Sequence, residues 1–173
     1  MVRVPMVEPN AEPAELHEVF EQLRRTRGRV PAMYRTLAHQ PAILTAHRAY
    51  FHATLDAGML KRDFKEKIAY KVARMRGAAY SAGSHRSYAL RHGVSSQELA
   101  QIDSSDYGAF LPNEMAALTF VEAMVNGGGK VPDALFDALR RHYVWAEIIE
   151  IVTLVGVMDL ASTLGAVFEL TPD

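Results

Sequence analysis

Proline and glycine divide this chain into segments of helical length, and within each segment apolar residues recur three or four positions apart. Helices are predicted near residues 13–28, 41–58, 62–76, 78–92, 95–103, 112–127, 132–141 and 144–167. The sequence offers no convincing run of alternating apolar and polar residues bounded by turn signals, so no strand is needed. The pattern therefore predicts an all-α fold.

The final segment, residues 144–167, is apolar almost all round. Glu150 and Asp159 interrupt it, and the apolar run between them is too short to cross a bilayer, so no membrane partner is expected. A helix of this kind is predicted either to lie at the centre of the fold or to be covered in part by another subunit.

Length and charge set further bounds on the chain. Its 173 residues suffice for one hydrophobic core, so residues 1–173 are expected to form a single domain, with residues 1–12 as an extended N-terminal arm. The 19 basic and 20 acidic residues leave a net charge of −1, which gives no field to attract nucleic acid. No secretory signal begins the chain, and a cytoplasmic protein is expected.

The chain contains no cysteine, which excludes a disulfide framework, thiolate metal ligation and a cysteine nucleophile. Histidine is the other common metal ligand, but His47 and His52 lie five apart and His85 and His92 seven apart. Neither spacing places two imidazoles on adjacent turns of one helix. Neither a metal nor another cofactor is expected, although a metal site shared by His85 and another subunit stays open as an alternative.

Glu66 lies on a helical face of small residues, with Ala69, Tyr70 and Ala73 on the same side. A carboxylate buried there would have a raised pKa, in the range that suits general acid or base catalysis. The alternative is a solvated carboxylate that pairs with Tyr70 or a neighbouring lysine.

Ser81 and His85 are four residues apart and share one face of the next helix. A hydroxyl one turn before an imidazole can hold the orientation of the ring or relay a proton. The alternative is that both belong to the exposed polar side of the helix.

The spacing from Glu66 through Ala78 and Ser81 to His85 resembles the alkylhydroperoxidase D-like, or carboxymuconolactone decarboxylase-like, family. Redox members of that family carry a Glu on one helix, then a Cys-x-x-Cys pair, then a His. Here Ala78 and Ser81 stand at the two cysteine positions, and Tyr80 matches the frequent aromatic residue between them. The resemblance continues through residues 28–44 and 92–99.

The resemblance implies an all-helical bundle that assembles as trimers or pairs of trimers. It also implies acid–base chemistry of the lactone-decarboxylase branch, in which a His at the position of His85 is kept. That branch often has an acidic residue and a Trp just before this His, where Ser81 and Ala82 stand here. Without the thiol pair, peroxidase or disulfide reductase activity of the usual kind is excluded.

We therefore expect a cofactor-independent enzyme of the decarboxylase, isomerase or hydrolase type, acting on a small organic acid, lactone or related carbonyl compound. Glu66 is the expected proton relay or base and His85 the principal acid or base, with Tyr80 and Ser81 as hydrogen-bond donors to the substrate. The alternative is a ligand-binding or structural oligomer that has lost the redox centre of the family.

Overall fold

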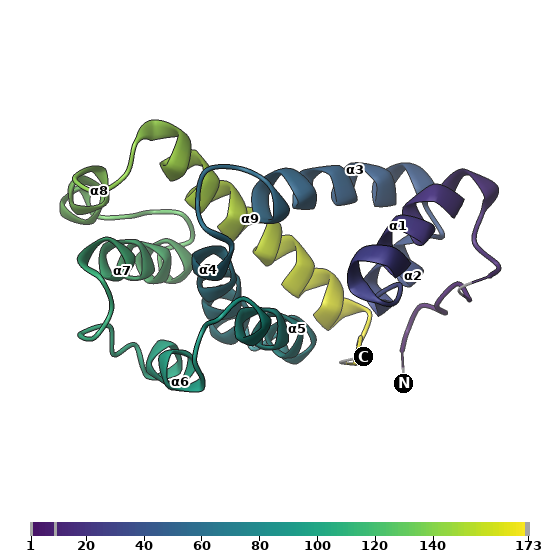
Figure 1. Cartoon of the computed structure of the whole chain (residues 1–173), viewed down its shortest axis with the longest axis horizontal. Coiled ribbons are helices and arrows are strands. Elements are labelled where there is room, and N and C mark those ends of the chain that lie inside the picture. Colours follow the sequence, from purple (N-terminus) through teal and green to yellow (C-terminus); the bar gives the residue numbers. More distant parts are fainter. Residues whose placement is uncertain (1, 9, 172–173) are drawn as a thin grey trace.

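The computed structural model describes residues 2–8 and 10–171, and throughout these residues the regular structure is helical, with no strand (Figure 1). This confirms the predicted all-α class. In chain order the elements are η1 (Ala14–Leu16), α1 (His17–Arg27), α2 (Ala32–Leu37), α3 (Pro41–Phe51), η2 (His52–Asp56), α4 (Arg62–Met75), α5 (Ala79–Arg91), α6 (Ser96–Ser104), α7 (Pro112–Asn126), α8 (Asp133–Arg140) and α9 (Trp145–Val167).

Several helix ends lie where the sequence signals place them. Pro41 and Pro112 open α3 and α7 in the first turn, where a missing backbone N–H costs nothing. Gly28 ends α1 in the left-handed conformation, with φ of 75°. Ser95 and Glu98 form a capping box at the start of α6, the helix predicted near residues 95–103.

The helix α2 was not predicted, because Gly28 and Pro31 break up the pattern around it and the helix is only six residues long. Pro31 sits at its N-cap, and five of its six residues are buried. Met33 and Tyr34 on this short helix reach the cavity described below.

The centre of the fold is α4, which packs against α5, α7 and α9. Three lysines of α4, Lys65, Lys67 and Lys71, are all buried. Their ammonium groups are paired with carboxylates of the surrounding helices, at Nζ to Oε distances of 2.6–3.4 Å: Lys65 with Glu150, Lys67 with Glu98 and Glu114, and Lys71 with Glu122. A buried charge must be paired, and each of these three lysines is.

The sequence left two positions open for α9, at the centre of the fold or partly covered by another subunit. Within this chain one of its faces packs on α4 and the core. Trp145, Ile149, Leu160 and Val167 remain exposed on the other face. By length and composition the whole helix could cross a membrane, unlike the shorter run between its two acidic residues. Half of that apolar window is nevertheless buried inside the fold, as in the core helix of a soluble protein.

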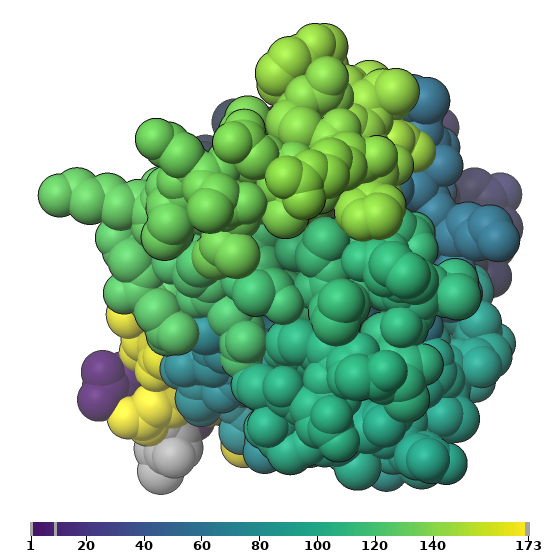
Figure 2. Space-filling model, turned by 90° about the vertical axis from the view of Figure 1, so that its left-hand side faces the viewer, coloured from purple at the N-terminus to yellow at the C-terminus, as the bar shows by residue number. Residues whose placement is uncertain are grey.

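Buried apolar residues form two clusters. The larger cluster surrounds α4. On the side of the molecule away from the N-terminal helices, α6, α7 and α8 form a continuous surface (Figure 2). The smaller joins α1, α2 and α3 to Tyr80 of α5 and to Ala161 and Leu170 near the C-terminal end. The two clusters meet where α5 faces the N-terminal helices (Figure 1), and that junction holds the cavity.

Candidate functional site

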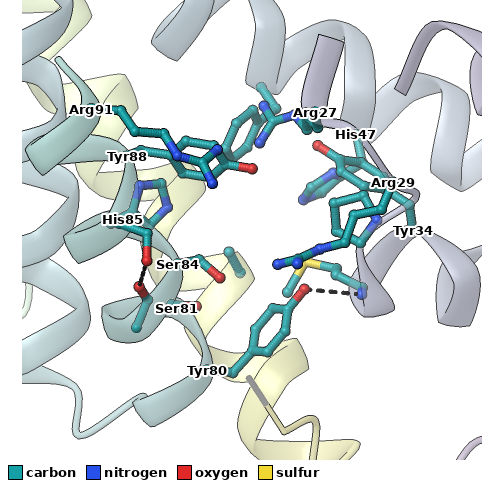
Figure 3. A pocket seen from close by; sticks show the side chains of 16 residues that line it. Arg27, Arg29, Tyr34, His47, Tyr80, Ser81, Ser84, His85, Tyr88 and Arg91 are labelled. Carbon is teal, nitrogen blue, oxygen red and sulfur yellow. Dashed lines mark hydrogen bonds between the residues drawn. The ribbon is translucent and has the colours of Figure 1, made fainter. Parts of the chain in front are cut away.

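A cavity of about 280 Å³ lies between α5 and the N-terminal helices (Figure 3). On one side are side chains of α5, and facing them are side chains from α1, α2, α3 and the loop after α1. The lining residues are Arg27, Arg29, Pro31, Met33, Tyr34, His47, Phe51, Tyr80, Ser81, Gly83, Ser84, His85, Ser87, Tyr88, Arg91 and Ala161.

Glu66 and His85 meet directly behind the cavity wall. Nδ1 of His85 lies 2.7 Å from Oε2 of Glu66, and both side chains are buried. The contact arises because α4 and α5 pack closely along their length, so residues nineteen positions apart face one another. His85 also lines the cavity, whereas Glu66 does not.

Arg62 is the second partner of Glu66, one turn earlier on α4. Its Nε and Nη2 donate to Oε1 of Glu66 at 2.8 and 2.6 Å. The same guanidinium also donates to Asp56, which Arg48 contacts from α3 at 3.2 Å. The carboxylate of Glu66 is thus the inner end of a network of charges that reaches toward the surface at Asp56.

The pKa of Glu66 is lowered, contrary to the expectation from the sequence. Burial on its own raises the pKa of this carboxyl, but the charges and hydrogen bonds of His85 and Arg62 outweigh burial and lower it below its ordinary value of 4.5. Glu66 is therefore an ionised carboxylate at neutral pH. The expectation failed because it counted desolvation alone and not the two partners.

The ionised state of Glu66 determines which ring nitrogen of His85 carries the hydrogen. A carboxylate only accepts hydrogen bonds, so Nδ1 of His85 must be the donor. In the neutral imidazole Nε2 then holds the free lone pair, and it can take a proton from a ligand. The imidazolium that results is stabilised by the negative charge of Glu66.

Tyr80 and Ser81 both line the cavity on the first turn of α5. The hydroxyl of Tyr80 accepts a hydrogen bond of 3.2 Å from the backbone N–H of Met33, which ties α5 to α2. Ser81 lies one turn before His85, but the ring of His85 is held by Glu66, so the interpretation of Ser81 as the group that orients this ring is corrected.

The two alternatives of a solvated Glu66 and a solvated Ser81–His85 face are both wrong. Glu66, Ser81 and His85 are all buried. Tyr70, the suggested partner of Glu66, instead donates to Asp103 at 2.9 and 3.1 Å.

The opposite wall contains functional candidates that the sequence did not reveal. Arg27, Tyr34 and His47 come from three different helices, and Arg91 at the end of α5 faces them across the cavity (Figure 3). No spacing along the chain connects them, because only the packing of α1–α3 against α5 brings them together. The one available signal was weak: Tyr34 and His47 are polar aromatics within otherwise helical, apolar segments.

His47 is buried, and neither of its ring nitrogens has a hydrogen-bond partner among the described residues. Burial and the neighbouring Arg48 lower the pKa of this imidazole, so it is neutral at neutral pH. Across residues 2–8 and 10–171, no group of three His, Asp or Glu side chains is placed to hold a metal ion.

Comparison with known proteins matches residues 41–123 to the model of the carboxymuconolactone decarboxylase family, a span that includes both Glu66 and His85. The uncharacterised protein YdfG of Bacillus subtilis (strain 168) is 28% identical over 99 residues, which are 56% of this chain and 67% of that protein.

Solved structures share the fold over almost the whole chain. An alkylhydroperoxidase AhpD core protein, described as peroxidase-related, from Ralstonia eutropha has 22% identity and a TM-score of 0.88, covering 99% of this chain and 92% of its own. The debrominase Bmp8 in complex with 2,3,4-tribromopyrrole has 21% identity and a TM-score of 0.85, with coverage of 100% and 92%. At these identities the likeness shows the fold alone.

Proposed function

We propose that this chain, a member of the carboxymuconolactone decarboxylase-like, or alkylhydroperoxidase D-like, family that lacks the cysteine pair of the redox members, is a cofactor-independent acid–base enzyme. Its substrate is a small organic acid, lactone or related carbonyl compound, and its reaction is of the decarboxylase, isomerase or hydrolase type. The observation that carries the proposal is the buried Glu66–His85 contact at the wall of a cavity.

In the proposed reaction, Nε2 of His85 takes a proton from the carbon next to a carbonyl group. The electron pair of that C–H bond moves into the carbonyl, which becomes an enolate, and Glu66 stabilises the imidazolium formed on His85. The hydroxyls of Tyr80 and Ser81 donate to the enolate or carboxylate oxygen. Return of the proton to a carbon of the product completes the cycle and restores neutral His85.

The charge of the cavity supports an acidic substrate. Arg27, Arg29 and Arg91 line it, and none of the sixteen lining residues is an Asp or Glu. A cavity walled by one sign of charge raises the local concentration of ligands of the opposite sign. The debrominase with this fold, which holds a tribromopyrrole, supports the idea that such a fold can enclose a small ring compound.

A second candidate is a ligand-binding or structural oligomer without catalysis. It is favoured by Ala78, a methyl group at the position of the first cysteine of the redox members. In either case the protein is not a thiol peroxidase of the usual kind, because no thiol exists to cycle through a disulfide.

We further propose that the protein acts in the cytoplasm as a homo-oligomer, a trimer or hexamer. The exposed apolar face of α9, with Trp145, Ile149, Leu160 and Val167, supports an interface with other copies. Single exposed apolar residues are ordinary, but a row of them along one helix indicates a contact surface.

Proton transfer can be tested before the natural substrate is identified. A panel of carboxylated γ-lactones and 3-oxo acids is incubated with the protein in D₂O, and exchange of the proton next to the carbonyl is followed by NMR together with release of CO₂. Glu66→Gln and His85→Asn should each slow exchange by about 10²–10⁴-fold, the usual contribution of a general acid or base.

The matched control is His142→Asn, at an exposed histidine away from the cavity. Each variant is assayed at a temperature at which circular dichroism shows it to be folded. If a compound that exchanges in the parent protein exchanges at the same rate in the Glu66→Gln and His85→Asn variants, the assignment of Glu66 and His85 is wrong. If no compound in the panel exchanges while one of them binds the cavity, the non-catalytic alternative is favoured.

A further inference from the structure

We propose that the cavity binds a small planar carboxylate of the hydroxybenzoate kind, with its ring along a wall of aromatic side chains and its ring substituent hydrogen-bonded to His47. The proposal rests on the function proposed above in sharing its cavity and its preference for an acid. It names a ligand and not a substrate of the proton abstraction, because the ring carbon that bears the carboxylate of a benzoate carries no hydrogen. It assigns to His47 a role in binding that is separate from the proton transfer at His85.

The wall is a continuous row of rings. Tyr34 meets His47 edge to face at 5.9 Å, and His47 stacks on Phe51 at 6.0 Å with planes 25° apart. Phe51 lies 6.4 Å from His85, which lies 6.3 Å from Tyr88. All five side chains line the cavity. Aromatic rings prefer offset stacks and edge contacts at these separations, so a planar ligand can extend the row where a puckered one cannot.

His47 supplies the second observation, independent of the row of rings. Only 7% of it is exposed, and both of its ring nitrogens are buried without a partner among the described residues. Burial of polar atoms without hydrogen bonds is unfavourable, and such atoms at the wall of a cavity mark a place where a ligand completes them. The neutral imidazole has one donor and one acceptor, and a hydroxyl group on the ligand matches either.

The arginines decide the charge of the ligand. Arg27 lies over the ring of Tyr88 at 5.1 Å and Arg91 over the same ring at 5.6 Å, so both guanidinium groups are held at one end of the row of rings. Asp56 is 3.7 Å from Arg27 but does not line the cavity. Guanidinium groups bind carboxylates in a planar, bidentate manner, which also favours a flat ligand.

The volume of the cavity suits a small ligand. The cavity of about 280 Å³ is just below the range of about 300–1,000 Å³ that holds drug-sized molecules. A benzoate ring with one further substituent fits within this space.

The test is isothermal titration calorimetry of the full chain with four probes that separate planarity, charge and the ring substituent. These are 4-hydroxybenzoate, benzoate, cyclohexanecarboxylate and 4-hydroxybenzamide. For about ten non-hydrogen atoms, we expect 4-hydroxybenzoate to bind with a Kd of about a millimolar or lower. The non-planar acid and the uncharged amide should each bind at least about tenfold more weakly.

Two variants assign the contacts. His47→Phe keeps a ring in the row but removes both nitrogens, so it should abolish the preference for 4-hydroxybenzoate over benzoate, whereas His142→Phe should keep it. Arg91→Gln should weaken both benzoates by at least about tenfold, and Arg141→Gln should not. Arg91 is exposed, so its replacement tests the charge even if His47→Phe were to unfold the protein.

Equal binding of the planar and non-planar acids, or of the acid and the amide, would overturn the proposal, as would the absence of binding by all four probes. Binding of acetate or inorganic phosphate as tight as that of 4-hydroxybenzoate would also overturn it, because the site would then recognise charge alone. Titration needs no turnover. If the benzoates bind but no compound exchanges protons, the proposed catalysis fails and the ligand class stands. If a lactone exchanges protons but no planar acid binds, the ligand class fails and the proposed catalysis stands.

Discussion

Replacing Glu66 with glutamine tests the electrostatic core of the site through stability as well as activity. The side chain is fully buried and accepts hydrogen bonds from His85 and from two nitrogens of Arg62. The amide keeps the shape but removes the negative charge, so Arg62 loses its inner partner. Removing one member of a buried ion pair costs about 3–5 kcal/mol, and we expect about 3 kcal/mol because Asp56 still contacts Arg62.

For a chain of this length, that loss of free energy of unfolding corresponds to a melting temperature lower by about 6–12 °C at pH 7. The effect must depend on pH with a definite sign. The pKa of Glu66 in the folded protein is below its ordinary value of 4.5, so its contribution is complete above pH 4.5 and is lost as the pH falls through the folded pKa. Glutamine does not titrate, and the gap between the two proteins should narrow in acid.

Melting temperatures from circular dichroism and urea unfolding curves, each measured at pH 7 and well below pH 4.5, provide the comparison. The exposed Glu18→Gln is the control and should melt with the parent protein at both pH values. If Glu66→Gln melts with the parent at pH 7, the pair is not a stabilising one. If instead the gap stays constant in acid, it arises from packing and not from the charge of Glu66.

Three further changes test other parts of the molecule. The double variant Ala78→Cys and Ser81→Cys places two thiols at the start of α5, where the helix terminus favours the thiolate. Thiol titration should show that they form a disulfide, and the variant should reduce an alkyl hydroperoxide in the presence of a dithiol. Inert thiols would show that the pocket is remodelled. Gly58→Ala adds a Cβ at a residue with φ of 100°, 1.6 Å from Oε1 of Glu150. It should lower the free energy of unfolding, measured by urea titration, by about 2–4 kcal/mol. An unchanged urea midpoint would contradict the close approach of Glu150 to Gly58. Ile149→Glu should reduce the mass measured by sedimentation to that of the monomer; a parent protein that is itself monomeric would refute the oligomer.

Local signals were reliable where a single residue determines the backbone. The prolines that open α3 and α7 and the capping box of Ser95 and Glu98 act within one turn, and each of these helices begins close to where it was predicted. The direct contact of Glu66 with His85 depends on how two helices cross, and only the family spacing pointed to it.

The rest required the tertiary structure. The pKa of Glu66 depends on Arg62 and His85 converging on one carboxylate, and no periodicity encodes their balance against burial. His47 gave no motif, because its partners on the cavity wall come from helices that are distant in the chain. The lysines of α4 look like a solvated face in sequence, since the carboxylates that pair with them are supplied by α6, α7 and α9.

The buried lysines of α4 can be used to measure how often the fold opens around this helix. The chain has five lysines; Lys65, Lys67 and Lys71 lie inside, while Lys61 and Lys130 are exposed. An amine-reactive reagent should therefore label the two exposed side chains of the native protein quickly. It should reach the other three only when α6, α7 or α9 moves away from α4. The mass of the labelled chain then records how often the central helix is uncovered, without any probe having been introduced.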